Sequence, residues 1–212
     1  MTTATDQPAG TERWHVNRNH RHITRHPEPE QWTDKWAVEA FTEAEKLHGT
    51  AIHEAAHTVL FCAAGIPIYS VTVRTMSEAV GTIPSGETNR GPFRATLQDV
   101  LAALCAGERA EDRWLRETGM WTTGRAWAAE RSALNDRTEA DGFIYQAAGV
   151  FLTCRSNGTW HDLATLHSHT DQVIAKHWAS ITDLADALVR ERHLDAQQIA
   201  SIARIDNPAA AS

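Results

Sequence analysis

The pattern of hydrophobic and polar residues along this chain of 212 residues predicts a long buried helix followed by a β element. Over residues 50–64, apolar side chains cover most of the circumference of a helix, which is typical of a helix buried on all sides. Gly65 and Pro67 then end this helix. From residue 69 to residue 74, hydrophobic and polar positions alternate, which predicts a half-buried strand.

The rest of the chain is expected to be helical apart from a second short strand. That strand covers residues 79–83, and residues 86–92 have the composition of a loop. Apolar residues recur at helical spacing elsewhere, which predicts helices over residues 39–46, 93–117, 135–148, 160–190 and 195–205. The expected fold class is therefore mainly α with a small β element.

Composition indicates one domain flanked by two polar segments. With 42% hydrophobic residues and eight tryptophans, the chain has ample material for one core. Residues 1–36 are polar and charged and contain Pro8, Pro27 and Pro29, which predicts a flexible N-terminal arm. We expect the domain over residues 37–206 and a disordered tail over residues 207–212.

The charge of the chain argues against a general nucleic-acid-binding protein. The formal net charge is −7, whereas phosphate contacts need a basic surface. Only residues 13–26 are locally basic, with four arginines, four histidines and no acidic residue. We interpret this stretch as a solvated part of the arm.

Cysteine usage and hydropathy indicate a protein of the cytoplasm. Cys62, Cys105 and Cys154 are widely spaced and form no C-x-x-C pair, so neither a disulfide framework nor a cysteine-based zinc site is indicated. The first two fall in apolar stretches and are expected to lie in the core. No apolar run approaches the ~20 residues of a membrane span, and no signal-peptide pattern opens the chain. The expected compartment is cytoplasmic.

An H-E-x-x-H pattern, formed by His53, Glu54 and His57, lies inside the expected buried helix. Residues four apart share one face of a helix, with Cβ atoms roughly 5–6 Å apart, so both imidazoles can bind one Zn²⁺. Glu54 is then placed to take a proton from a zinc-bound water. Burying these three side chains is costly unless a metal compensates. The pattern is typical of zinc metallopeptidases.

A catalytic zinc ion needs a third protein ligand. The extended pattern H-E-x-x-H-x-x-G-x-x-H would place glycine and histidine where the chain has Leu60 and Ala63, so the metzincin class is excluded. Glu108, Glu111 and Asp136 remain as carboxylate candidates. The last of them also has the composition of a helix N-cap, and spacing alone does not decide between the three.

Five segments, in order, resemble the peptidase domain of the FtsH family, the membrane-anchored AAA+ zinc proteases. They are A-I-H-E-A-A-H at residues 51–57, V-T-V with A-V-G-T at 71–73 and 79–82, A-G-E-R-A-E-D at 106–112, A-L-N-D at 133–136 and L-V-R-E-R-H-L at 188–194. They are similar to the family's H-E-A-G-H helix, V-T-I and L-G-x-T strands, G-G-R-x-A-E-E helix, A-S-N-D-I-x-x-A-T segment and terminal L-L-x-x-E-x-L helix. The resemblance covers about residues 40–205.

This resemblance implies an FtsH-peptidase-like helical zinc metallopeptidase domain. On the matching positions, it implies that His53, His57 and Asp136 hold Zn²⁺ and that Glu54 is the general base. Glu111 then becomes a residue that could orient a ligating histidine.

The chain also departs from the family's pattern. Ala56 stands where the family has glycine and could crowd a neighbouring helix, and residues 119–131 do not align. No lysine is preceded by glycine, so the G-x-x-x-x-G-K phosphate loop of the ATPase domain is missing. Without unfolding machinery, we expect an endopeptidase for short peptides or unfolded polypeptides, unless a separate ATPase docks. A homo-oligomer is also open.

Two other functions stay open on the sequence. The chain could be a zinc-binding regulatory or interaction module without proteolysis, or a zinc hydrolase of a specialised amide. The presence of Glu54 favours an enzyme, because a purely structural zinc site has no need of a base. His161, His167 and His169 do not indicate a second metal site, since positions 167 and 169 face apart on a helix. We expect them on a solvated surface.

Overall fold

The computed structural model of this chain describes residues 14–16, 23–30, 41–78, 81–92 and 94–211. This part of the chain is mainly helical with a small sheet, which confirms the expected fold class at that level. In chain order its elements are β1 (His15–Val16), β2 (Ile23–Thr24), α1 (Glu43–Ala63), β3 (Ile68–Glu78), β4 (Gly81–Arg90), α2 (Leu97–Leu104), α3 (Ala106–Glu117), α4 (Thr123–Ser132), α5 (Leu134–Ala148), α6 (Leu163–Glu191), β5 (His193–Asp195), α7 (Ala196–Ala203) and the 3₁₀ helix η1 (Pro208–Ala211).

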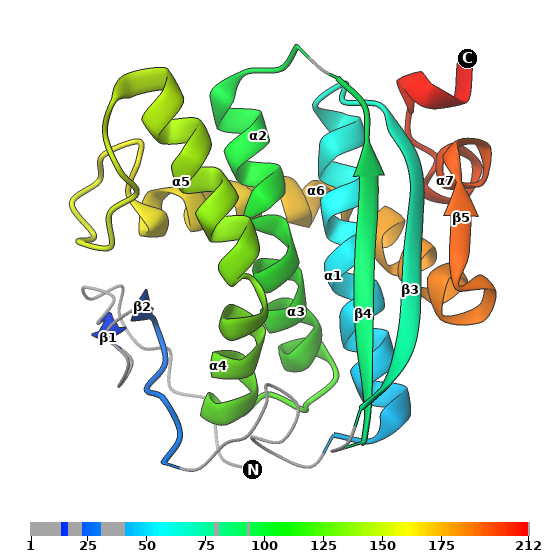
Figure 1. Cartoon of the computed structure of the whole chain (residues 1–212), viewed down its shortest axis with the longest axis horizontal. Helices are drawn as coiled ribbons and strands as arrows, with labels where there is room; N and C mark the ends of the chain where they lie inside the picture. Colours follow the sequence, from blue (N-terminus) through cyan, green and yellow to red (C-terminus); the bar gives the residue numbers. More distant parts are fainter. Residues whose placement is uncertain (1–13, 17–22, 31–40, 79–80, 93, 212) are drawn as a thin grey trace.

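Helix α1 lies at the centre of the molecule, between the sheet and the other helices (Figure 1). All residues from 50 to 62 are buried, which confirms the prediction of a buried helix. A capping box begins the helix: the Thr42 hydroxyl accepts from the Glu45 N–H at 3.2 Å, and the Glu45 carboxylate accepts from the Thr42 N–H at 2.7 Å. Residues 43–46 therefore belong to α1 and not to a separate helix.

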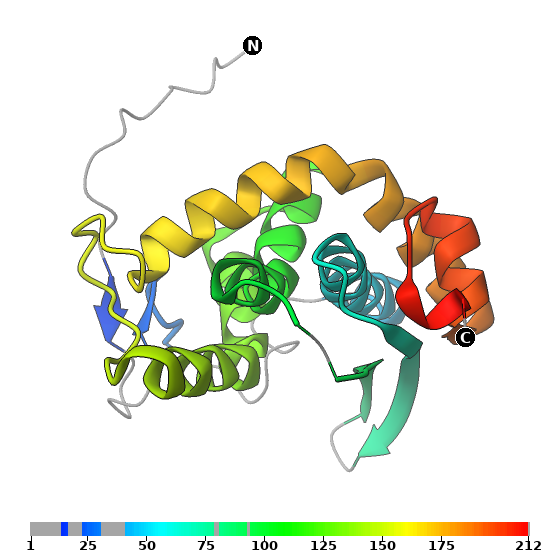
Figure 2. The same cartoon turned by 90° about the horizontal axis from the view of Figure 1, so that it is seen from above.

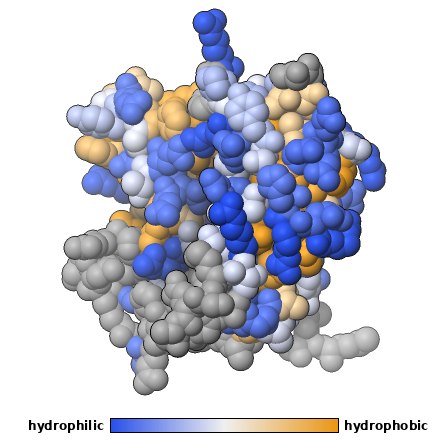
Figure 3. All heavy atoms as spheres, turned by 45° about the vertical axis from the view of Figure 1, so that its right-hand side comes forward, coloured by the Kyte–Doolittle hydropathy of each residue, from blue (hydrophilic) through white to orange (hydrophobic). Residues whose placement is uncertain are grey.

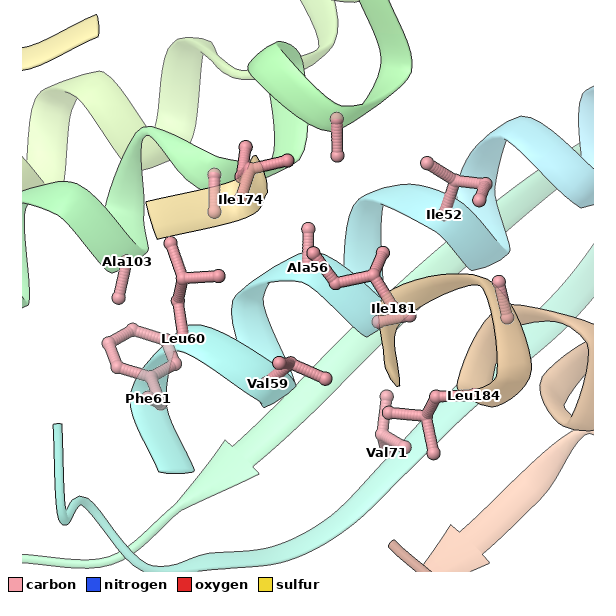
Figure 4. Packing of buried hydrophobic residues seen from close by; sticks show 14 of the residues in the cluster. Ile52, Ala56, Val59, Leu60, Phe61, Val71, Ala103, Ile174, Ile181 and Leu184 are labelled. Carbon is pink, nitrogen blue, oxygen red and sulfur yellow. The ribbon is translucent and has the colours of Figure 1, made fainter. Parts of the chain in front are cut away.

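The core forms on both sides of α1. Seen from above, the long helix α6 runs along one side of α1, and the β3–β4 hairpin lies on the other (Figure 2). Ile181 and Leu184 from α6 and Val71 from β3 belong to the same buried cluster as the apolar side chains of α1 (Figure 4). Ala56, the departure from the FtsH motif, is fully buried in this cluster, so its methyl group is part of the core packing.

The sheet has the strand order β4-β3-β5, and both pairings are antiparallel. Strand β3 buries Val71 and Val73 and exposes Arg74, which confirms the predicted alternation over residues 71–74. It is wrong at Tyr69, which is exposed, because the strand register shifts between Ile68 and Ser70. The loop expected over residues 86–92 is wrong for residues 86–90, because these pair with β3 as part of β4. Hydrophilic side chains predominate among the described residues on the face that Figure 3 shows.

The helices after the sheet differ from the predicted ones in two respects: one predicted helix is divided, and helix α4 was not predicted. Residues 93–117 do not form one helix: α2 ends at Leu104, α3 begins at Ala106, and Cys105 between them has ψ −6°. The segment that did not align with the FtsH pattern contains most of α4, and its Trp127 is fully buried. As predicted, Cys105 is a buried core residue.

The described parts of both terminal segments contact the folded unit, so the interpretation of residues 13–26 as solvated is wrong for Thr24 and Arg25, whose side chains are largely buried. Arg25 donates from its backbone N–H and its Nε to the buried Glu130 carboxylate of α4, both at 2.7 Å. The disordered tail expected over residues 207–212 is wrong for Asn207, whose side chain is buried and bonds both the N–H and the carbonyl of Ile68. Among the described residues, no helix combines the length and apolar character needed to cross a membrane.

Candidate metal centre

The side chains of His53, His57 and Asp136 meet at one point. Both histidines come from α1, and Asp136 comes from the first turn of α5. Nε2 of His53 lies 2.9 Å from Nε2 of His57 and 3.3 Å from Oδ2 of Asp136, and Nε2 of His57 lies 3.5 Å from that same oxygen. The structure therefore brings together the three residues that could hold a metal ion and that the resemblance implied.

The chemistry of these three atoms fits a cation. The Nδ1–H of His57 donates to the carbonyl of Ala103 at 2.7 Å, and Nδ1 of His53 lies 2.6 Å from Glu111 Oε1. When both imidazoles are neutral with Nδ1 protonated, each presents a lone pair at Nε2, and two lone pairs and a carboxylate oxygen then face one another. One proton can bridge only two of these atoms, whereas one metal ion satisfies all three. Tetrahedral Zn²⁺ would set ligand atoms roughly 3.3 Å apart, close to the observed separations.

The charges around the site also favour a cation. Burial alone would lower the pKa of His53, but hydrogen bonds to Asp136 and Glu111 raise it to about 10. Burial would raise the pKa of Asp136, but the neighbouring histidines hold it well below its usual range. The carboxylate thus stays ionised, and the site stabilises positive charge at its centre.

Glu111 lies on the opposite edge of the His53 ring from the meeting point. It contacts Nδ1, not Nε2, so it orients the histidine and does not reach the metal position. Its Oε1 also lies 3.0 Å from the hydroxyl of Ser132, at the end of α4. Gly107 leaves room for the ring, since a Cβ atom there would lie 2.4 Å from it. Ser132 was missed in the sequence, where nothing links it to the motif.

The alternative interpretation of Asp136 as a helix N-cap is wrong. Helix α5 begins at Leu134, its N-cap is Ala133, and no side chain caps it. Asp136 lies inside the first turn, where a carboxylate is favoured by the helix dipole. Its side chain points to the histidines of α1 instead of the backbone of its own helix.

Glu108, the remaining carboxylate candidate, belongs to a separate buried network. Its carboxylate accepts from Arg137 through Nε at 3.0 Å and through Nη2, and from Nε2 of His167 at 2.9 Å. Cys105 lies close enough to complete a second group of metal-ligating atoms. The guanidinium already neutralises the carboxylate and would repel a cation, so we interpret this group as a structural ion-pair network.

The expectation that His167 lies on a solvated surface is wrong, because only 2% of the residue is exposed. Helix α6 turns its ring toward Glu108 in the core. The sequence held a signal for this position: His167 follows Leu163 and Leu166 on the apolar face of the helix.

The burial of His167 predicts a pH dependence of stability. Burial lowers its pKa from 6.5 to about 4, although Glu108 acts in the opposite direction. Between these two values the unfolded chain binds a proton that the folded chain does not, so stability falls as the pH drops below 6.5. From pH 7 to pH 5 the free energy of unfolding should fall about 2 kcal/mol more in the wild type than in His167→Gln.

Urea unfolding of both proteins at several pH values measures this difference. His193→Gln, which changes an exposed histidine, is the matched control and should behave like the wild type. Parallel pH profiles for wild type and His167→Gln would contradict the assignment of a buried, neutral imidazole.

Glu54 lies beside the metal centre and against strand β4. Its Oε2 accepts a hydrogen bond of 2.7 Å from the Thr88 hydroxyl, and a Cβ atom at Gly86 would lie 2.4 Å from its Oε1. An open cleft of about 250 Å³ borders the centre. It is lined by Thr50, His53, Glu54, Pro84, Ser85, Gly86, Ser132, Asn135 and Asp136. A larger cavity of about 460 Å³ between α2, α5 and α6 is mostly apolar and includes none of the metal-centre side chains.

The comparisons with known proteins add no assignment. The sequence matches no protein-family model and none of the curated proteins. The function therefore has to be argued from the site itself.

Proposed function

We propose that this protein is a zinc-dependent metallopeptidase that hydrolyses peptide bonds in short or unfolded polypeptides. The observation that carries the proposal is the arrangement of four side chains from the H-E-x-x-H helix and α5. His53, His57 and Asp136 present three ligand atoms to one point, and the Glu54 carboxylate lies beside that point on an open cleft. Catalytic zinc sites in proteins have three protein ligands and one open position.

The chemistry divides between the ion and the chain. When bound, Zn²⁺ would polarise the scissile carbonyl and lower the pKa of a water molecule. The carboxylate of Glu54 accepts the proton of the attacking water and then passes it to the amine that leaves as the C–N bond breaks. Glu111 and the carbonyl of Ala103 hold the two imidazoles in the tautomer that leaves Nε2 free.

The position of β4 supports an extended peptide as substrate. It is at one end of the strand order β4-β3-β5, so among the described strands its outer edge has no pairing partner. Pro84, Ser85 and Gly86 of this strand line the cleft. An exposed edge offers backbone donors and acceptors to a peptide in β conformation, and proline within a strand is typical of such an edge. Strand β4 is longer than the strand expected over residues 79–83.

The order of the five motifs along the chain supports an FtsH-like peptidase domain. In that family, ATP hydrolysis unfolds and threads the substrate. We propose that this chain acts on polypeptides that are already extended, or that a separate ATPase unfolds its substrates.

A comparison of one substrate in two states tests the proposal. We expect a permanently unfolded variant of a small protein to be cleaved by the purified, zinc-loaded chain without ATP, while the native form resists. The reason is that a folded chain cannot place an extended segment along β4. Fragments are measured by mass spectrometry, with a chelator-treated sample as the control.

The outcomes separate the alternatives. Equal cleavage of both forms would contradict the proposed requirement for an extended substrate. Cleavage of neither form by zinc-loaded protein would favour a regulatory module or a required ATPase. Hydrolysis of small amide substrates without any peptide cleavage would favour a specialised amidase.

A further inference from the structure

We propose that strand β4 positions the general base, with the Thr88 hydroxyl holding one oxygen of Glu54 and Gly86 leaving the space that the other oxygen occupies. The catalytic consequence rests on the proposed peptidase function, whereas the positioning itself does not. Thr88 and Gly86 are positioning residues in this account, since they act through Glu54.

The hydroxyl of Thr88 is hydrogen-bonded to one carboxylate oxygen of Glu54. Its Oγ1 lies 2.7 Å from Glu54 Oε2, against 3.4 Å from Thr58 Oγ1 and 3.5 Å from the Glu54 carbonyl. A hydroxyl has one proton, and the charged carboxylate at the shortest distance is its strongest acceptor. The hydrogen bond therefore fixes Oε2 on β4 and leaves the lone pairs of Oε1 for the cleft.

Gly86 leaves the space beside the other carboxylate oxygen of Glu54. A Cβ atom at this position would lie 2.3 Å from Cγ, 2.4 Å from Oε1 and 2.6 Å from Cδ of Glu54. These separations are far below van der Waals contact, so the carboxylate lies in the volume that any other residue's side chain would fill. Gly86 and Thr88 are two apart on one strand and thus present the same face to α1.

Helix α1 alone does not fix Glu54. A glutamate side chain has three rotatable bonds, and the chain has to restrict them for the carboxylate to accept a proton at one position. The strand that does this is also the one whose outer edge is open to a peptide. One element would thus align both the base and the substrate.

Variants of Thr88 and Gly86 in the full-length, zinc-loaded protein test the inference through activity. Thr88→Val removes the hydroxyl at nearly constant volume and should lower kcat by roughly tenfold, the effect of losing one hydrogen bond to a charged group, with little change in KM. Thr88→Ser keeps the hydroxyl and should restore most of kcat. Gly86→Ala should displace the flexible carboxylate and lower kcat at least as much. Zinc content should be unchanged in all three.

Matched controls separate positioning from general effects. Thr75→Val changes an exposed threonine of β3, and Gly142→Ala adds a methyl group that would contact no atom outside the adjoining backbone of its own helix within 4 Å. Both should retain wild-type kcat. Equal losses of kcat in Thr88→Val and Thr88→Ser would overturn the proposed role of the Thr88 hydroxyl. Wild-type kcat in Gly86→Ala would overturn the proposal that Gly86 has to leave space for the Glu54 carboxylate.

A double-mutant cycle provides a readout that needs no activity. Thr88→Val, Glu54→Ala and the double variant are compared by urea unfolding of zinc-free protein. We expect coupling of roughly tenfold in the unfolding equilibrium constant, about 1.4 kcal/mol. Absence of coupling would overturn the inference even in an active enzyme. Coupling in a protein that cleaves no peptide would leave the positioning intact and count against the proposed peptidase function alone.

Discussion

Replacing Asp136 with alanine should empty the metal centre, while replacing Glu111 with alanine should only weaken it. Oδ2 of Asp136 is one of the three atoms that meet at the site, within 3.5 Å of both Nε2 atoms. Its loss leaves two ligands, too few for a zinc site with an open position. Glu111 contacts the far edge of His53, and loss of such a partner typically costs ~10–100-fold in metal affinity.

The zinc content of each variant, after equilibration with a competing chelator, measures this difference. Asp183→Ala is the matched control, because it removes a partly exposed aspartate whose ion pair with Arg204 lies at the surface. A full site in Asp136→Ala together with an empty one in Glu111→Ala would mean that the glutamate is the ligand. The FtsH-like assignment would then be wrong.

Local pattern was sufficient to predict the elements whose environment is uniform along their length. Residues 50–62 of helix α1 are apolar over most of the circumference and are buried on all sides in the structure, so periodicity and burial agree. Strand β3 has one buried face, and the alternation of Val71 and Val73 with polar residues reports it directly. The motif spacing within α1 fixes the relation of His53 to His57, because a helix places residues four apart on one face.

Where the predicted helices and loops were wrong, contacts with other parts of the chain determine the observed structure. Residues 86–90 contain glycine and asparagine and have loop composition, yet pairing with β3 along its length makes them a strand. Residues 97–117 keep a helical period through Cys105, where the helix is interrupted between α2 and α3. Periodicity of hydrophobic residues carries no signal for an interruption of this kind.

The candidate site likewise contains residues that the sequence could identify and residues that it could not. Glu54 lies in the motif, but Thr88 is 34 residues further along the chain, and nothing in its neighbourhood marks it as a contact of Glu54. The choice between Glu111 and Asp136 needed the direction in which each side chain points at His53: one carboxylate lies at Nδ1 and the other at Nε2. Spacing in a sequence does not contain that information, and only the family resemblance favoured Asp136.

Glu54→Gln should abolish most hydrolysis while leaving the metal in place. The amide keeps the size of the side chain and an oxygen that can accept from Thr88, but it cannot take a proton from water. Loss of a general base typically lowers kcat by ~10²–10⁴-fold, so a decrease in that range is expected against an unfolded polypeptide substrate. Zinc content should match the wild type, since Glu54 supplies none of the three meeting atoms.

The matched control for this variant is Glu43→Gln, which changes an exposed glutamate in the first turn of the same helix and should retain wild-type activity. Activity and zinc content are measured on the same preparations. An unchanged cleavage rate in Glu54→Gln would mean that the hydrolysis originates elsewhere, in another site or a contaminating protease. A parallel loss of zinc and activity would instead make Glu54 a part of the metal-binding set, since a base that only handles the proton can be removed without releasing the ion.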